Sequence, residues 1–327
     1  MIITRTPFRV SFAGGGSDLP SYYRRHGGAV VSTAISKYMY VTVNKRFDDT
    51  IRISYTRTEI VDRPDDLQHD IVRAALRKVG IDRGVEISTI ADIPAGTGLG
   101  SSSTLTVGLL HALHAYAQRF AGAERLAEEA CEIEIDTLGK PIGKQDQYAA
   151  AFGGMNYIRF NSDDSVVIEP IVCTSATRRH LKDCLLLFYT GLTRKSEQIL
   201  SEQKTKTEKG DADNYLSSLV ELAEELRNAL CHDEPAAVGD ILHRAWLVKR
   251  EIVSGISDPQ IDRWYEEARA AGAIGGKLLG AGGGGFLLLY CEPERQRALR
   301  GRMAEIGLRE VEFTFEGQGS RIIYVEE

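Results

Sequence analysis

The sequence has few cysteines and no long hydrophobic run. Its 5 cysteines are scattered over 327 residues, and none stands in C-x-x-C spacing, so we expect reduced thiols and no disulfide framework. No apolar stretch approaches about 18 residues. Residues 1–10 alternate like a strand and lack the apolar centre of a signal peptide. We therefore expect a cytoplasmic protein with no membrane partner.

An excess of basic side chains is absent as well. The 40 Lys and Arg residues are outnumbered by 46 Asp and Glu, which gives a formal net charge of −6, so no general basic field would attract nucleic acid. A length of 327 residues with 43% hydrophobic side chains is enough for two globular domains. We predict domains at residues 1–165 and 166–327, in a monomer or homodimer that acts on small molecules.

Hydrophobic periodicity predicts both strands and helices. β-Branched and polar residues alternate through residues 1–60, which predicts a sheet. Apolar residues then recur at helical spacing over residues 67–79, 102–116, 124–138 and 145–152. After a further strand at 183–189, the pattern is mainly helical over 195–271 and ends in a strand, a glycine-rich loop and a strand over 274–291.

A glycine-rich loop at residues 94–104 is the strongest single feature of the sequence. It reads P-A-G-T-G-L-G-S-S-S-T, so a turn with alternating glycines leads directly into the hydroxyl-rich start of a helix. The backbone N–H groups of such a loop and the dipole of the helix bind anions, and phosphate is the natural occupant. The loop has neither the G-K-[ST] element of a Walker A loop nor the spacing of a dinucleotide-binding G-x-G-x-x-G.

The alternative for this loop is a plain strand-to-helix turn in which Ser101 or Ser102 caps the helix. Three glycines followed by three serines exceed what a cap requires, which favours phosphate binding. The residues that we expect to bind the phosphates are Gly96, Gly98, Leu99, Gly100, Ser101, Ser102 and Ser103.

Glu134 points inward on its predicted helix. The apolar side chains of residues 126–138 form one arc at about 100° per residue, and Glu134 lies in the middle of this arc. A buried carboxylate is costly unless it is paired or bound to a metal. Two interpretations stay open: an internal salt bridge with an arginine, or a Mg²⁺ site that also uses a serine hydroxyl of the loop.

Three further segments carry two interpretations each, and a fourth, at residues 7–18, carries one. Asp146 in G-K-Q-D-Q-Y is either an N-cap or the acceptor of a proton from a substrate hydroxyl. Residues 280–285, G-A-G-G-G-G, either allow close backbone approach by a neighbour or ligand or form a flexible hairpin. Arg194 in T-R-K-S either holds a phosphate or is simply solvated. Residues 7–18, P-F-R-V-S-F-A-G-G-G-S-D, read as a strand that runs into a plain turn.

Taken together, these motifs resemble those of the GHMP kinase superfamily, which includes galactokinase and mevalonate kinase. Three family motifs appear in order, at residues 7–18, 94–104 and 277–286. The first motif, G-K-Q-D-Q-Y-A-A-A-F-G-G and Y-T-G-L-T-R-K-S-E are most similar to the D-glycero-α-D-manno-heptose 7-phosphate kinases. The resemblance implies an α+β fold of two lobes, a sheet-and-helix N-terminal lobe and a ferredoxin-like C-terminal lobe.

The resemblance also implies roles for individual residues. Asp146 matches the acid that acts as catalytic base, and Arg9 matches an arginine near the reacting centre. Glu134 matches the acid that binds Mg²⁺, and Ser102 matches the hydroxyl ligand. The residues expected at the substrate are Asp18, Gly15, Gly16, Gly283 and Arg194.

One departure from the family bears on the substrate. Galactokinases carry Glu-His where this chain has Gly15-Gly16, and the loss of that acid removes a charge that would repel a phosphorylated sugar. We therefore expect an ATP- and Mg²⁺-dependent kinase that phosphorylates the anomeric hydroxyl of a heptose 7-phosphate. The alternatives are a kinase for fucose or another unphosphorylated sugar, and a catalytically silent sensor that binds sugar and ATP.

Overall fold

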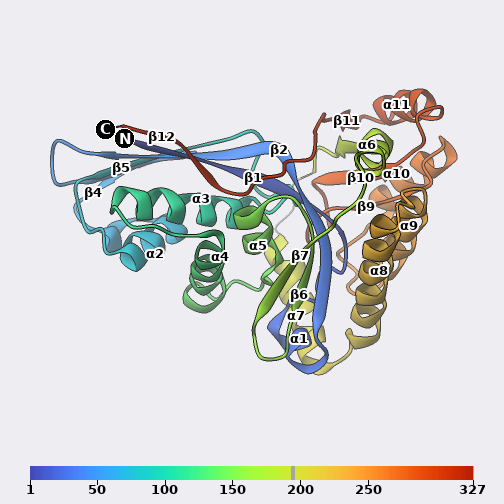
Figure 1. Ribbon diagram of the computed structural model, residues 1–327, viewed down its shortest axis with the longest axis horizontal. Coiled ribbons are helices and arrows are strands. Elements are labelled where there is room, and N and C mark those ends of the chain that lie inside the picture. The colour runs from blue at the N-terminus through green and yellow to red at the C-terminus, as the bar shows by residue number, and fades with distance from the viewer. Residues whose placement is uncertain (193–195, 327) are drawn as a thin grey trace.

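A long, bent sheet forms the first lobe. The computed structural model describes residues 1–192 and 196–326. The strands of this sheet are β1 (Ile2–Ala13), β2 (Gly28–Lys45), β3 (Ile51–Ser54), β4 (Thr58–Val61), β5 (Val85–Ala91), β6 (Met155–Phe160), β7 (Val166–Pro170) and β12 (Arg321–Val325). Their order is β12-β1-β2-β5-β3-β4, with β6 pairing β2 and β7 pairing β6. All pairs are antiparallel except β3 with β5, and Figure 1 shows how β2 bends along its length.

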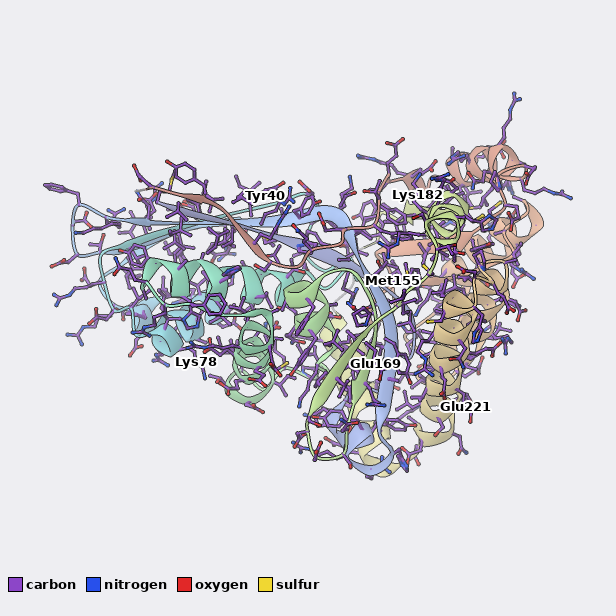
Figure 2. The ribbon with its side chains drawn as sticks, in the orientation of Figure 1. Tyr40, Lys78, Met155, Glu169, Lys182 and Glu221 are labelled. Atoms are coloured by element: carbon purple, nitrogen blue, oxygen red, sulfur yellow. The ribbon has the colours of Figure 1, made fainter. Side chains whose placement is uncertain are left out.

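Helices cover one side of this sheet and bury its apolar side chains. They are α2 (Asp70–Val79), α3 (Ser101–Tyr116), α4 (Ala123–Cys131) and α5 (Gln145–Phe152), with a short 3-10 turn η1 (Pro64–Asp66) before α2. The short helix α1 (Pro20–His26) lies apart from them, next to α7 (Ser196–Lys209). Figure 1 shows α2, α3, α4 and α5 together beneath the sheet, and α3 packs directly on β1 and β2. Side chains fill the space between the layers in Figure 2, where Met155 at the start of β6 is one of the buried residues.

The predicted helix at residues 124–138 differs from the observed structure. The α-helix ends at Cys131, and the chain continues as a π-helical segment, η2 (Glu132–Thr137). Such widened turns are rare and often occur at functional sites. Glu134 lies within this segment and is fully buried, so its predicted inward orientation is confirmed.

The second lobe is ferredoxin-like. Its strands are β8 (Leu185–Tyr189), β9 (Gly275–Leu278), β10 (Phe286–Tyr290) and β11 (Arg309–Glu310), in the antiparallel order β11-β8-β10-β9. Helices separate β8 from β9 and β10 from β11, which gives the split βαββαβ arrangement. The helices of this half are α6 (Ser175–Cys184), α7 (Ser196–Lys209), α8 (Asp213–Cys231), α9 (Ala237–Arg250), α10 (Pro259–Ala270) and α11 (Gln296–Glu305). The predicted two-lobed α+β fold is therefore confirmed.

The two lobes share a broad interface. α8 packs on the bent part of the first sheet, and the last strand of the chain, β12, returns to pair with β1 (Figure 1). The domain boundary after residue 165 stays a prediction: β7 begins at Val166 and pairs with β6 in the first sheet. Among the described residues, no helix combines the length and the apolar character that crossing a membrane requires.

Candidate active site

Two cavities adjoin at the interface of the lobes. The larger, of about 720 Å³, is lined by the glycine-rich loop, by the end of β5 and by glycines of the segment 280–284. The smaller, of about 100 Å³, is lined by residues of the segment 15–19, by the start of α5 and by side chains of α9 and β9. Arg9, Asp146 and Gly280 line both cavities, so they stand at the junction.

The predicted phosphate loop forms a wall of the larger cavity. Leu99 does not line the cavity; it is fully buried, and its carbonyl accepts a hydrogen bond from the backbone N–H of Arg9 at 3.3 Å. The N-cap of α3 is Gly100, so the interpretation of Ser101 or Ser102 as the cap is wrong. The predicted phosphate-binding residues that line the cavity are Gly96, Gly98, Gly100, Ser101, Ser102 and Ser103.

The second glycine-rich segment presses against the first. A Cβ atom built on Gly280 would lie 2.4 Å from the Cα atom of Gly98, and one on Gly285 would lie 2.2 Å from the carbonyl oxygen of Thr97. Residues 280–285 connect the antiparallel strands β9 and β10 as a hairpin and allow close backbone approach between the lobes. Gly283 itself lies behind the cavity wall, where its N–H donates to the carbonyl of Ile256 at 3.0 Å.

Arg9 and Asp146 form a bidentate ion pair at the junction. Nε and Nη2 of Arg9 donate to the two carboxylate oxygens of Asp146 at 2.7 and 2.8 Å, and Nη1 donates to the carbonyl of Gly98 at 2.7 Å. Such paired, charge-assisted hydrogen bonds fix both side chains in orientation. The N-cap of α5 is Lys144, so the capping interpretation of Asp146 is wrong.

Glu134 belongs to a buried polar cluster next to the phosphate loop. Its Oε2 accepts from Nε2 of Gln147 at 2.8 Å, and its Oε1 accepts from the hydroxyl of Ser102. Nζ of Lys140 lies 3.0 Å from Oγ of Ser102 and 3.4 Å from Oε1 of Glu134. The salt bridge therefore involves a lysine and not an arginine. The hydroxyl and carboxylate oxygens next to the phosphate loop also fit a Mg²⁺ ion, which prefers such ligands.

Asp18 is held at the smaller cavity by backbone groups. Its Oδ1 accepts from the N–H of Gly16 at 2.9 Å, and its Oδ2 accepts from the N–H of Gln145 at 3.1 Å. Burial raises the pKa of Asp18, the backbone hydrogen bond from Gln145 opposes this shift, and the charge of Asp146 adds to it. Gly15 and Gly16 line the same cavity, whereas Arg194 lies outside the described residues.

Several residues of the site were not expected from the sequence. Lys140 and Gln147 hold Glu134, and Lys249 of α9 and Lys277 of β9 line the smaller cavity. Helical spacing predicts that Lys249 faces inward, because it follows the buried residues of α9 at that spacing. No comparable pattern marks Lys277, which lies in a short, fully buried strand.

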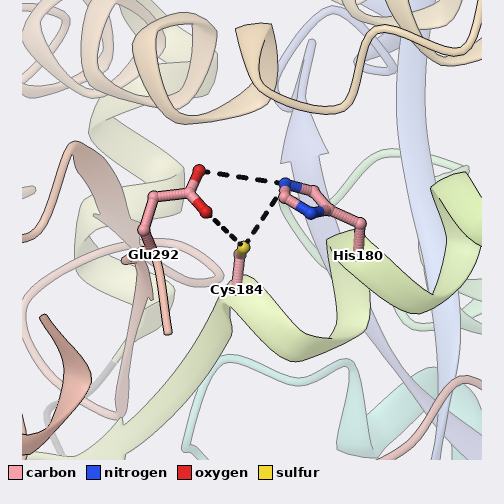
Figure 3. Close-up of side chains that lie close together, drawn as sticks. All are labelled: His180, Cys184 and Glu292. Atoms are coloured by element: carbon pink, nitrogen blue, oxygen red, sulfur yellow. Dashed lines mark hydrogen bonds and ion pairs between the residues drawn. The ribbon is translucent and has the colours of Figure 1, made fainter. Parts of the chain in front are cut away.

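A separate group of side chains could also hold a metal. The ligand atoms of His180, Cys184 and Glu292 lie within 4.8 Å of one another (Figure 3), and none of the three lines either cavity. Sγ of Cys184 lies 3.5 Å from Nε2 of His180 and 3.4 Å from Oε2 of Glu292. Burial raises the pKa of Cys184 to about 12, and its thiol donates a hydrogen bond to Glu292.

Comparison with known proteins adds family relationships to this geometry. Residues 67–154 match the model described as GHMP kinases N terminal domain, and residues 223–307 match the model described as GHMP kinases C terminal. The two matches together cover parts of both lobes, including the phosphate loop, α5 and β9.

Relatives of known name match nearly the whole chain. A D-glycero-alpha-D-manno-heptose 7-phosphate kinase from Campylobacter jejuni is 31% identical over 97% of this chain and 97% of its own length. The L-fucokinase/L-fucose-1-P guanylyltransferase of Bacteroides fragilis is 28% identical over 97% of this chain, but the match spans only 38% of that protein. The crystal structure of a D-glycero-D-manno-heptose 1-phosphate kinase from Bacteroides thetaiotaomicron superimposes with a TM-score of 0.83 at 25% identity, covering 100% of both chains.

The contact between the two glycine segments can be tested by substituting Gly98. Gly96 and Gly98 both have a left-handed φ, of +76° and +83°, but only a Cβ on Gly98 would collide, at 2.5 Å from the carbonyl oxygen of Leu279. We expect Gly98→Ala to weaken ATP binding by at least about tenfold more than Gly96→Ala, because only Gly98→Ala forces the two segments apart. Calorimetric titration with ATP measures the difference, and equal losses in the two variants would contradict it.

Proposed function

The chain belongs to the GHMP kinase family, and we propose that it transfers the γ-phosphoryl group of ATP to the anomeric hydroxyl of D-glycero-α-D-manno-heptose 7-phosphate. The observation that carries this proposal is the position of Asp146, which lines both cavities at their junction. A kinase must bring the acceptor hydroxyl and the terminal phosphate of the nucleotide to one point. The junction is the point that both cavities share, and the product is the 1,7-bisphosphate.

The larger cavity is assigned to ATP. The backbone N–H groups of the phosphate loop and the N-terminus of α3 would hold the β- and γ-phosphates. The cavity also reaches Tyr55 and His69, whose rings pack edge to face with their centroids 4.8 Å apart. These rings and the apolar residues at the end of β5 offer a surface for the nucleoside.

Asp146 is assigned the role of general base. Its carboxylate accepts the proton of the acceptor hydroxyl as the new O–P bond forms. Arg9 fixes the direction of the carboxylate through two hydrogen bonds and brings a permanent positive charge to the junction. That charge stabilises the phosphoryl oxygens during transfer, when their negative charge is redistributed.

Ser102 and Glu134 are assigned to the Mg²⁺ ion that accompanies the nucleotide. Their oxygens lie in hydrogen-bond contact next to the phosphate loop, which suits an ion that takes few protein ligands and several from phosphate and water. When bound, the ion neutralises charge on the phosphates. Gln147 orients the carboxylate by its hydrogen bond of 2.8 Å. The ammonium of Lys140, which bridges the hydroxyl and the carboxylate, would have to leave this position when the ion binds, because two cations cannot share the same two oxygens.

The smaller cavity is assigned to the sugar. Asp18 retains unused lone pairs after accepting its two backbone hydrogen bonds, and these can accept from sugar hydroxyls. Gly15 and Gly16 contribute no side chain to the wall. The wall is close here, because a Cβ on Gly16 would lie 2.4 Å from Nε2 of Gln203.

The names of the two heptose kinases agree on a heptose monophosphate but differ in the position of its phosphate. The Campylobacter jejuni protein is named for the 7-phosphate, and the Bacteroides thetaiotaomicron protein for the 1-phosphate. The relative named for the 7-phosphate is 31% identical over 97% of this chain and 97% of its own length. This full-length match supports the 7-phosphate as the acceptor, which leaves the anomeric oxygen as the nucleophile.

A substrate panel tests the acceptor. We expect sugar-dependent release of ADP with D-glycero-D-manno-heptose 7-phosphate, and values of kcat/KM at least about 100-fold lower with fucose, galactose and mannose. Phosphorus NMR of the product is expected to show a new anomeric phosphate. Preference for fucose would favour a fucokinase-like enzyme, and ATP binding without any sugar-dependent turnover would favour a silent sensor.

The role of Asp146 is tested by the isosteric amide. Asp146→Asn is expected to fold and bind ATP but to lose turnover by more than about 100-fold, because the amide cannot accept the proton. Single-turnover phosphoryl transfer measures this loss. The control is Asp211→Asn, which changes an exposed carboxylate that lines neither cavity. Unchanged turnover of Asp146→Asn would remove this residue from the mechanism.

The role of Glu134 is tested by a metal titration. Glu134→Gln is expected to raise the Mg²⁺ concentration for half-maximal activity by about tenfold or more, because an amide oxygen is a weaker ligand than a carboxylate. Glu132→Gln is the matched control, since Glu132 lies in the same π-helical segment but is exposed and pairs with Lys78. Identical titrations of Glu134→Gln and the parent enzyme would exclude this carboxylate as a ligand.

A further inference from the structure

Two lysines face the smaller cavity without a carboxylate partner. Lys249 and Lys277 are only 7% and 3% exposed, and both line this cavity. Nζ of Lys277 donates to the carbonyl of Phe12 at 2.9 Å, and Nζ of Lys249 donates to the carbonyl of Gly280. Within residues 1–192 and 196–326, neither ammonium has a carboxylate oxygen within 4.0 Å.

The charged groups around this cavity include one more basic side chain than acidic ones. Its carboxylates are Asp18 and Asp146; Asp146 is engaged by Arg9 through both oxygens, and Asp18 accepts from backbone N–H groups. Three cationic side chains therefore face two anionic ones. A buried ammonium without a counter-ion is costly, and a bound anion would offset that cost.

We propose that Lys249 and Lys277 form an oxyanion subsite that binds the phosphate ester already present on the acceptor sugar. This inference rests on the proposed function and names the residues that would recognise the phosphate of its substrate. The γ-phosphoryl group of ATP is the other oxyanion near the junction. Arg9 and the phosphate loop line the ATP cavity and would bind the γ-phosphoryl group. Both lysines line the smaller cavity and not the ATP cavity.

The ionisation of the lysines gives the subsite a pH dependence. Burial lowers the pKa of Lys249 to about 8, and Arg9 adds to this effect while Asp18 and Asp146 oppose it. Burial also lowers the pKa of Lys277, with further lowering by the charges of Lys249 and Arg9. A phosphate dianion stabilises the ammonium form, so its binding raises both pKa values and takes up protons.

The test compares two acceptors and two lysine variants. Lys249→Met keeps the length of the side chain and removes the charge. Lys206→Met is the matched control, because Nζ of Lys206 also donates to a backbone carbonyl, that of Ile252 at 3.0 Å, but the residue lines neither cavity. KM and kcat are measured with D-glycero-D-manno-heptose 7-phosphate and with the unphosphorylated heptose.

We expect Lys249→Met to raise KM for the 7-phosphate by about 10- to 100-fold, with kcat changed by less than about threefold. KM for the unphosphorylated heptose should stay as in the parent enzyme, and Lys206→Met should behave as the parent with both acceptors. An equal fall of kcat with both acceptors would place Lys249 at the transferred group and overturn the proposal. Unchanged parameters in Lys249→Met would overturn it as well.

Failure of this subsite is distinguishable from failure of the proposed function. A parent enzyme that turns over only unphosphorylated sugars would refute the function itself. A parent enzyme that prefers the 7-phosphate, with the same preference in Lys249→Met, would refute the subsite alone.

A measurement on the unmodified enzyme covers the case in which Lys249→Met does not fold. The 7-phosphate is titrated calorimetrically at pH 8 with a nonhydrolysable ATP analogue present, in two buffers of different ionisation enthalpy. A sugar phosphate is almost fully dianionic at this pH, since its second pKa is about 6. Protons taken up on binding would therefore go to the lysines and not to the phosphate. We expect proton uptake on binding and weaker affinity above pH 8, and binding with no proton uptake would overturn the proposal.

Discussion

The bidentate ion pair between Arg9 and Asp146 is the contact on which the rest of the site depends. Arg9 belongs to β1 and Asp146 to α5, and the same guanidinium donates to the carbonyl of Gly98 in the phosphate loop. One rigid, planar group thus fixes three segments relative to one another, which the single ammonium of a lysine would not achieve with the same geometry. The guanidinium side chain is only 4% exposed, and its three acceptors compensate the loss of water around its charge.

Close backbone contact sets the distance between the lobes. The hairpin of β9 and β10 carries residues 280–285 onto the phosphate loop, where a Cβ on Gly280 would lie 2.4 Å from the Cα of Gly98. A third glycine brings the carboxylate of Asp146 close to the same loop, since a Cβ on Gly100 would lie 3.2 Å from Oδ2 of Asp146. The absence of side chains at these positions lets backbone donors and a carboxylate reach one point, which phosphoryl transfer requires.

The sequence predicted local features better than contacts between distant segments. Helical spacing identified Glu134 as inward-facing, and the bounds of α5 were correct. The same spacing places Lys249 on the buried face of α9, a position that lysine seldom occupies. The pairing of Asp146 with Arg9 joins residues 137 positions apart, so no local pattern contains it; only the family motifs brought the two residues into one site.

The two cavities offer their proposed ligands different chemistry. In the larger cavity, the phosphate loop offers backbone N–H groups and a helix N-terminus, which keep their protons over the whole physiological pH range. In the smaller cavity, the proposed recognition would rest on Asp18 and Lys249, and burial moves the pKa of Asp18 upward and the pKa of Lys249 down to about 8. The proposed binding of the nucleotide phosphates would therefore use loop donors that do not titrate, whereas the proposed binding of the acceptor would depend on two buried groups that approach neutrality from opposite directions. A phosphorylated acceptor satisfies both, because its hydroxyls donate to the carboxylate and its phosphate accepts from the ammonium.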